Sequence, residues 1–370
     1  MKYLINFTTA ITLLAAMNVG ASIKTIDTDY YGKTVYIDVD TKEVISVGTG
    51  WRGSYGASGT KEQATPHALG IGNAVSVIAS VGRQFILQAD GNVWMVDRRT
   101  DYNDIKVRPL VKLPIAKVSD VEANADHAFF IVDGSVHQMD LANKGSVELV
   151  KGLPNNIVEI SVAIFHSIAR TANGDVYIWG QNRKSQAADG VIIDRATPRI
   201  IAGLPAIKAI STARYNTVLT DIDGNVWTMN EGRTENRNGA DFAEWSPVKL
   251  PINNPQTVAK GYAGMKQTMV LFNDAHVEMI GWHNDKKGCD FNMAYTMSTS
   301  PELTGIQDLD SGNHSMFIKQ SGRVIGWGVN NHGQLGNGLY SETQISGGML
   351  PIIWPDNYGV KLKILQLSLK

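Results

Sequence analysis

The chain has 370 residues, of which 43% are apolar and 19% charged, and its formal net charge is -1. With 36 glycines this composition is typical of one globular domain rich in turns, and it excludes a disordered or collagen-like chain. The near-zero charge without a run of Lys or Arg argues against a nucleic-acid partner, and the single cysteine, Cys289, excludes an intramolecular disulfide.

The chain begins MKYLINFTTAITLLAAMNVGAS, which has the pattern of a signal peptide: Lys2 precedes an apolar stretch that ends in small residues. Val19 and Ala21 stand at the positions that a signal peptidase reads, which predicts cleavage after Ala21. We therefore predict that residues 1–21 are a signal peptide and that residues 22–370 are a periplasmic or secreted protein. A buried N-terminal segment is the alternative. Polar residues interrupt the stretch, so no membrane span is predicted.

One sequence unit recurs along the chain, and each copy has a valine that opens an alternating stretch after a turn signal: Val44, Val93, Val136, Val176, Val226, Val277 and Val324. The intervals of 40 to 51 residues suit a four-stranded propeller blade. A single unit cannot bury its apolar faces alone, whereas a ring of units can. Seven copies therefore predict an all-β, seven-bladed β-propeller of four-stranded antiparallel blades, in one domain that spans residues 22–370.

The copy around Val176 shows how a unit is organised. A strand through Ile168 leads to a turn at Asn173-Gly174, and the next strand alternates so that Tyr177 and Trp179 share a face. A long polar loop follows, then an apolar stretch that contains Leu-Pro, and then another short strand. In an up-and-down meander the long loops emerge at one end of the ring and the Asp-Gly turns at the other.

The two ends of the chain suggest how the ring closes. The segment KLKILQLSLK at the C-terminus alternates as a strand without a hairpin partner, and KTVYIDVDTKEV near the start reads as a hairpin without a preceding strand. We predict that the C-terminal strand, Lys363 to Leu369, pairs with the N-terminal hairpin containing Val44 and closes the ring.

The segment WGVNNHGQLGNG from Trp327, preceded by GNHSMFIKQSGRVIG, resembles the repeat of the regulator of chromosome condensation (RCC1-like) family. WGQNRKSQAADG from Trp179 keeps the start of that repeat, whereas the copies after Val93, Val136 and Val226 lack its Trp-Gly pair. The resemblance implies a seven-bladed propeller and, with the signal peptide, an exported bacterial member. Such members include inhibitors that cap a secreted or periplasmic enzyme, and the family's better known activity is nucleotide exchange on a small GTPase.

Histidines at equivalent repeat positions argue against a catalytic or metal site. His127, His166 and His314 occupy a slot that holds Gln84, Asn216 and Gln267 in other copies, so the slot is expected to form hydrogen bonds to backbone at a turn. A loop cluster of possible ligands lacks zinc spacing: His283, Asp285, Cys289 and Asp290. We find no nucleophile elbow or phosphate-binding loop. No catalytic residue, metal or cofactor is predicted.

Aromatic residues fall into two groups. Those on hairpin strands are expected in the core between blades: Trp94, Trp179, Trp227, Trp282 and Trp327. Those in or beside the long loops, with two arginines, are the candidate partner-binding residues: Trp51, Arg52, Tyr55, Tyr102, Arg183, Trp245, Phe291 and Tyr340. The alternative is that these aromatic side chains only fix their own loops.

These observations predict an exported, non-enzymatic, monomeric propeller that binds a macromolecule, most plausibly a protein, through the long loops of one face. Two alternatives stay open. One is an enzyme or carbohydrate-binding protein with its site at the central mouth of the propeller. The other is an effector that acts on a small GTPase of a host cell.

Overall fold

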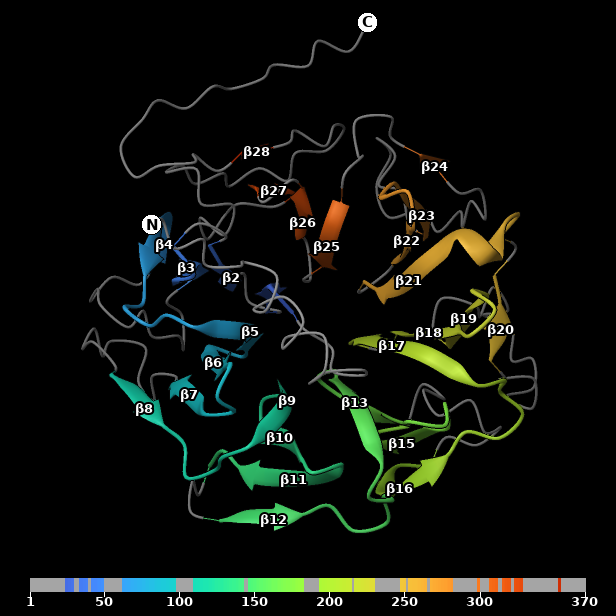
Figure 1. The fold of residues 1–370 in the computed structure, drawn as a ribbon, viewed down its shortest axis with the longest axis horizontal. Helices are drawn as coiled ribbons and strands as arrows, with labels where there is room; N and C mark the ends of the chain where they lie inside the picture. The colour runs from blue at the N-terminus through green and yellow to red at the C-terminus, as the bar shows by residue number, and fades with distance from the viewer. Residues whose placement is uncertain are drawn as a thin grey trace, which may run out of the picture.

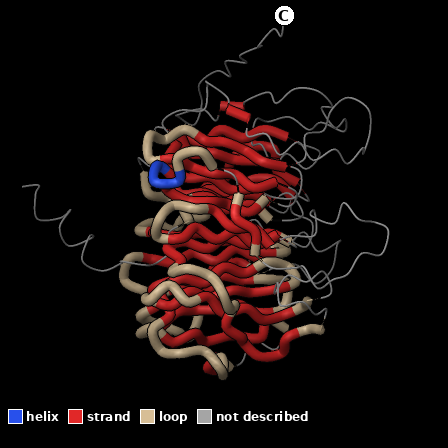
Figure 2. Tube along the Cα trace, turned by 90° about the vertical axis from the view of Figure 1, so that its right-hand side faces the viewer, coloured by secondary structure: helices blue, strands red, loops and turns tan. Residues whose placement is uncertain are grey.

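The computed structural model describes residues 24–29, 33–38, 41–49, 62–97, 109–142, 146–182, 193–214, 216–229, 247–250, 252–264, 267–281, 298–299, 306–311, 315–320, 323–328 and 352–353. Their strands lie in sheets that follow one another around a common centre (Figure 1). Seen from the side, the strands cross the thickness of a flattened body (Figure 2).

The described strands form seven four-stranded sheets. The first three sheets contain β1 (Ile26–Thr28), β2 (Lys33–Ile37), β3 (Val44–Thr49) and β4 (Glu62–Ala68); β5 (Ala74–Ser80), β6 (Arg83–Gln88), β7 (Val93–Val96) and β8 (Leu110–Lys112); β9 (Val118–Ala123), β10 (His127–Val132), β11 (Ser135–Asp140) and β12 (Val147–Leu149). The fourth and fifth contain β13 (Ile157–Val162), β14 (His166–Thr171), β15 (Val176–Gly180) and β16 (Arg195–Ile200); β17 (Ile207–Ala213), β18 (Asn216–Asp221), β19 (Val226–Met229) and β20 (Val248–Lys249). The last two contain β21 (Val258–Ala263), β22 (Gln267–Phe272), β23 (Val277–Gly281) and β24 (Ser298–Thr299); β25 (Ile306–Ser311), β26 (Ser315–Gln320), β27 (Arg323–Gly328) and β28 (Ile352–Ile353).

Each sheet is an antiparallel meander in which strands pair in chain order, from an inner strand near the centre to an outer strand at the rim. A 3-10 helix at Pro255–Thr257 precedes β21. The predicted all-β propeller of four-stranded antiparallel blades is confirmed, and every repeat valine lies in the third strand of its sheet.

The predicted ring closure is wrong. The first sheet obtains its inner strand from β1, which pairs with β2 through Ile26 and Tyr36, Asp27 and Val35, and Thr28 and Thr34. The hairpin therefore does have a strand before it, and the position assigned to Lys363–Leu369 is occupied. That C-terminal segment itself lies outside the described residues.

The core consists of apolar clusters between consecutive sheets. In β10, Phe129 and Ile131 pack toward the fourth sheet in a cluster that includes Trp179, whereas Ala128 and Phe130 pack toward the second sheet. Because successive side chains of a strand point to opposite faces, one strand contributes to two clusters. Six such clusters join the sheets from the first to the last.

The tryptophan prediction is confirmed where side chains are described. Trp179 is buried between the third and fourth sheets, while Trp94 and Trp227 pack against the clusters on either side of it in the ring. The indole of Trp227 also donates a hydrogen bond to Asp221 Oδ2 at 3.0 Å. Trp282 and the side chain of Trp327 lie outside the described residues.

The hairpin turns between second and third strands pack against the segment that enters the next sheet. Gly224 has a φ of +83°, and a Cβ atom there would lie 1.8 Å from the carbonyl oxygen of Pro255. Glycine is therefore required both for the turn conformation and for the close approach. These turns lie at the end of the sheets opposite to the long connections, which we call the turn face.

Candidate binding face and central cavity

All long connections leave the sheets at one end. In each meander the first strand ends, the second begins and the third ends at the same side, so the connection between third and fourth strands starts there. The connections between β3 and β4, β7 and β8, β15 and β16, and β19 and β20 all follow this rule. We call this side of the molecule the loop face.

The eight predicted partner-binding residues all belong to such connections and lie outside the described residues. They fall between β3 and β4 (Trp51, Arg52, Tyr55), β7 and β8 (Tyr102), β15 and β16 (Arg183), β19 and β20 (Trp245), β23 and β24 (Phe291), and β27 and β28 (Tyr340). The flanking strand ends are on the loop face. Their role in binding stays a prediction.

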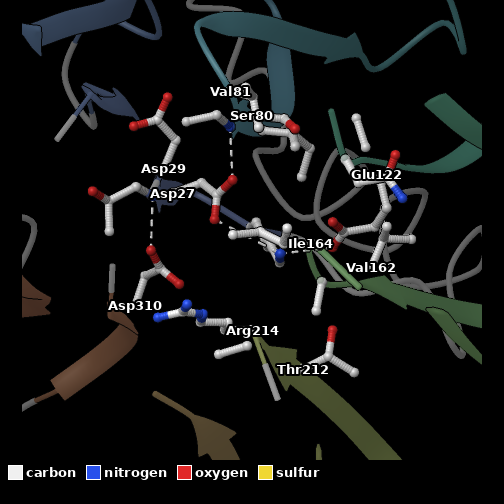
Figure 3. Close-up of a pocket in the computed structure, with 18 of the residues that line it drawn as sticks. Asp27, Asp29, Ser80, Val81, Glu122, Val162, Ile164, Thr212, Arg214 and Asp310 are labelled. Atoms are coloured by element: carbon white, nitrogen blue, oxygen red, sulfur yellow. Dashed lines mark hydrogen bonds and ion pairs between the residues drawn. The ribbon is translucent and has the colours of Figure 1, made fainter. Parts of the chain in front are cut away.

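A cavity of about 100 Å³ lies at the centre of the molecule, where the inner strands end. Its lining includes the turns that follow four inner strands, represented by Val81, Asn124, Ile164 and Arg214, which places it at the loop face. Side chains from different sheets point into this space (Figure 3). The structure thus has a central mouth at the end from which the long connections leave.

The cavity is lined by more carboxylates than cations. Its acidic residues are Asp27, Asp29, Glu122 and Asp310, and its basic residues are Lys24 and Arg214. The Lys24 ammonium lies 2.7 Å from Glu122 Oε1 and 3.7 Å from Asp27 Oδ1. Since Lys24 precedes β1 and Glu122 belongs to β9, this ion pair joins the first sheet to the third across the centre.

Burial shifts the protonation of these groups. It raises the pKa of the Glu122 carboxyl to about 7 and also raises the pKa of Asp27, against the opposing attraction of Lys24. Burial disfavours the charged ammonium of Lys24, but attraction to Asp27 and Glu122 outweighs it and raises the pKa of Lys24. The centre therefore contains a permanent cation beside carboxyl groups that ionise up to neutral pH.

Polar atoms of the inner strands connect neighbouring sheets. A side-chain oxygen of one inner strand, or of the residue just after it, accepts a hydrogen bond from a backbone N–H of the next sheet or of the segment that leads into it. The donors and acceptors are Ala79 to Asp27 (2.7 Å), Gly82 to Asp29 (3.0 Å), Ile160 to Asp120 (3.3 Å), Thr212 to Ser161 (3.0 Å), Ala263 to Ser211 (2.9 Å) and Thr25 to Asp308 (3.1 Å). These bonds satisfy N–H groups on strand edges that face the centre.

A second ionic group spans the centre on the other side. Glu159 in β13 accepts a hydrogen bond from Arg170 Nε at 2.8 Å, and the ammonium of Lys260 in β21 lies 3.6 Å from the same carboxylate. Like the Lys24–Glu122 pair, the Lys260–Glu159 pair passes over one intervening sheet. Sequence reasoning missed both pairs because their partners are about a hundred residues apart in the chain. The only signal was a charged residue within an apolar inner strand, as in VSDVEA and IVEISV.

The repeated histidine slot is structural, but its partners differ from those predicted. His166 Nε2 lies 2.7 Å from the Thr217 hydroxyl in the next sheet, so the partner is a side chain and not backbone at a turn. Asn216 in the equivalent slot does reach backbone, since its amide donates to the Gly264 carbonyl at 3.1 Å. Burial lowers the pKa of His166 to about 4, so the ring is neutral at pH 7. His314 lies outside the described residues.

Within the described ranges, no group of three or more His, Cys, Asp or Glu side chains is arranged to hold a metal ion. The loop cluster of His283, Asp285, Cys289 and Asp290 is not among those ranges. In the part of the chain that the structure describes, no helix has the length and apolar character needed to span a membrane.

Comparison with known proteins supports the sequence resemblance. Residues 157–186 and 311–334 match the Regulator of chromosome condensation (RCC1) repeat. Mouse E3 ubiquitin-protein ligase HERC2 is 25% identical over 214 residues, which cover 54% of this chain and 4% of HERC2. The ultraviolet-B receptor UVR8 of Arabidopsis thaliana is 22% identical over 215 residues, which cover 55% of this chain and 48% of UVR8. The chain thus spans less than half the length of these two relatives.

Solved structures show the same fold. Yeast RCC1 (Prp20) in its complex with Kap60 has a TM-score of 0.69 at 16% identity, covering 85% of this chain and 84% of that chain. Prp20p from Saccharomyces cerevisiae has a TM-score of 0.70 at 14% identity, covering 85% and 87%. Human WBSCR16 has a TM-score of 0.63 at 17% identity, covering 84% and 92%. The predicted resemblance to the RCC1 repeat family is confirmed.

Proposed function

We propose that this RCC1-like propeller binds a protein partner through its loop face, as a monomer and without catalysing a reaction. In this proposal the seven sheets are the blades of one propeller that holds the long connections in fixed relative positions. The observation that carries it is the common exit of those connections around the central cavity. A rigid ring that presents several loops to one side provides a large surface without ordering costs.

The solved relatives support a protein partner. One structure with this fold is RCC1 bound to Kap60, and another is described with its binding to Gsp1p and histones. HERC2 is named as a ubiquitin ligase, but the aligned segment is only 4% of its length. We therefore carry over binding and not ligase activity.

We further propose that the protein is exported after cleavage of residues 1–21. The supporting observation is the sequence pattern that ends at Val19 and Ala21. Intact-mass measurement of the protein purified from periplasm and culture medium is expected to give a chain that begins at Ser22. A cytoplasmic protein that retains its N-terminal residues would contradict export.

Binding through the loop face can be tested with two matched triple variants. The first changes loop residues (Trp51→Ala, Tyr102→Ala, Trp245→Ala). The second changes exposed apolar residues away from that face (Val111→Ala, Ile200→Ala, Ile222→Ala). A partner captured from periplasmic extract is identified by mass spectrometry, purified and titrated against each variant by calorimetry.

We expect the loop variant to lose at least about tenfold in affinity, because aromatic anchors carry most of the energy of such interfaces. The control variant is expected to bind like the wild type. Loss of binding in the control variant with full binding in the loop variant would contradict the proposal.

The central cavity favours one alternative, a small ligand bound at the mouth of the propeller. Its excess of carboxylates would select a basic group. If an extract component bound equally to both triple variants but not to Glu122→Gln, the cavity and not the loops would be the binding site.

A further inference from the structure

The first inner strand differs from the others in length. β1 has three residues, whereas the inner strands of the other sheets have six or seven, and it pairs with β2 at three positions only. Nevertheless Ile26 within it is 1% exposed. Contacts other than strand pairing must therefore hold this segment in place.

Contacts to the last sheet are made by carboxylates of β25. The Thr25 N–H and hydroxyl both donate to Asp308 Oδ2, at 3.1 and 3.0 Å, and the Thr28 N–H donates to Asp310 Oδ2 at 2.7 Å. Among the described residues these hydrogen bonds are the side-chain contacts between the last sheet and the first. They join segments that are more than 280 residues apart in the chain.

Contacts to the second and third sheets depend on carboxylates too. Asp27 accepts from the Ala79 N–H and Asp29 from the Gly82 N–H, while the ammonium of Lys24 pairs with Glu122. Two neutral contacts add to them, since Lys24 N donates to the Ser76 hydroxyl at 3.1 Å and Val77 N to the Lys24 carbonyl at 2.9 Å. The segment Lys24–Asp29, here called the N-terminal latch, is thus attached to three other sheets mainly through titratable groups.

Carboxylates exceed cations around the latch. The charged and titratable groups that face it or each other come from every neighbouring element: Lys33 of β2, Asp120 and Glu122 of β9, Glu159 of β13, Arg214 after β17, Lys260 and Tyr262 of β21, and Asp308 and Asp310 of β25, together with Lys24, Asp27 and Asp29 of the latch itself. Seven carboxyl groups therefore share a small volume with four cations. Ionising all of them together is unfavourable in such a space.

We propose that the N-terminal latch is controlled by protons: it holds the first, second, third and last sheets together while the central carboxyl groups retain a proton, and it loosens when all of them ionise. Burial raises the pKa of Asp27, Asp308 and Glu122, the last to about 7. A raised pKa in the folded state gives stability that is complete below the unfolded value and is lost as the pH rises through the folded value. The latch is therefore expected to loosen as the pH rises through about 7.

The structure contains an internal control for this proposal. The same inter-sheet bond is made by hydroxyls at two other junctions, where Ser161 accepts from Thr212 N–H and Ser211 from Ala263 N–H. Hydroxyls do not titrate in this range. Any pH effect specific to the latch should therefore appear at Thr25 and Thr28 and be absent at these two amides.

The test is amide hydrogen exchange on the full-length protein between pH 6 and 8, corrected for the intrinsic pH dependence of exchange. The ratio of protection at Thr25 and Thr28 to that at Thr212 and Ala263 is expected to fall about tenfold, as for one carboxyl group with a pKa near 7 that returns to its ordinary value on opening. A constant ratio across this range would overturn the proposal.

Two variants separate the latch from general stability. Glu122→Gln keeps an acceptor for Lys24 but cannot ionise, so the ratio should stay within about twofold between pH 6 and 8. Ser211→Ala should lower protection at Ala263 equally at every pH and leave the Thr25 response intact. If Glu122→Gln kept the full pH response while remaining folded by near-ultraviolet circular dichroism, Glu122 would not be the controlling group and the proposal would fail.

Discussion

The buried polar residues of this propeller join sheets to one another. His166 is 1% exposed, lies against Thr217 of the next sheet, and has its pKa lowered by burial. Asp120 and Asp308 are likewise buried and accept hydrogen bonds from backbone of neighbouring sheets. At the residue scale, an ionisable group at the centre of this fold therefore indicates attachment between blades before it indicates chemistry.

His166 is expected to make the protein sensitive to acid. Its pKa of about 4 in the folded state is below the ordinary value of 6.5, so the stability it provides is complete above pH 6.5 and is lost as the pH falls toward 4. The loss should be on the order of 3 kcal/mol. His166→Asn, which copies the residue found at Asn216, should remove this dependence. Urea unfolding at several pH values measures both, and equal acid sensitivity of the two proteins would contradict the assignment.

Trp179 is expected to be a major contributor to the junction between the third and fourth sheets. Its ring lies edge-on to Phe129 with centroids 5.8 Å apart, inside an apolar cluster. Trp179→Ala should lower the free energy of unfolding by about 3–5 kcal/mol. Ile222→Ala, at a side chain 64% exposed, should change it by less than about 0.5 kcal/mol. Similar small effects in denaturant titrations of both variants would show that the indole is not part of the core.

At the scale of the element, the hairpin turns have two solutions to one backbone problem. Gly224 has a φ of +83° against Pro255, whereas Ala275 in the matching turn of the sixth sheet has a φ of 66°. Both positions precede the segment that enters the next sheet, and Ala275 accepts a hydrogen bond from the Ile306 N–H at 3.0 Å. A side chain is compatible with the second turn and sterically excluded from the first.

Opposite substitutions in these turns should have opposite effects. Gly224→Ala is expected to destabilise the protein by at least about 2 kcal/mol, because the Cβ atom would overlap the Pro255 carbonyl and the left-handed conformation disfavours it. Ala275→Gly should stabilise it by about 0.5–1 kcal/mol by relieving that conformational cost. Thermal unfolding of both variants measures the two shifts, and shifts of the same sign would refute the explanation.

The strands with clear alternation could be predicted from sequence, and the short or polar features could not. Val176 and its six equivalents mark third strands because a turn and a period of two are both visible there. β1 was missed because three residues cannot show a period. The central ion pairs were missed because Lys24 and Glu122 meet only once the sheets are arranged in a ring.

For the molecule as a whole, two kinds of junction hold the sheets in sequence. Apolar clusters fill the six junctions between consecutive sheets, from Val35 at the first to Leu309 at the last. Where the last sheet meets the first, the described side-chain contacts are the carboxylates of Asp308 and Asp310 on backbone of the N-terminal latch. Apolar contacts are insensitive to pH and carboxylate contacts are not, so conditions can change one junction while the other six are retained.

Removal of the latch tests which end of the chain completes the first sheet. Deleting residues 1–29 removes β1, uncovers the surface that buries Ile26, and removes the donors to Asp308 and Asp310. We expect a loss of at least about 5 kcal/mol, from burial of one Ile side chain and several hydrogen bonds. Deleting Ile364–Lys370 leaves β1 on β2, so the first sheet should be retained and the melting temperature should change little. Differential scanning calorimetry distinguishes the cases: a folded protein without residues 1–29, together with an unfolded one without Ile364–Lys370, would return the closing strand to the C-terminus.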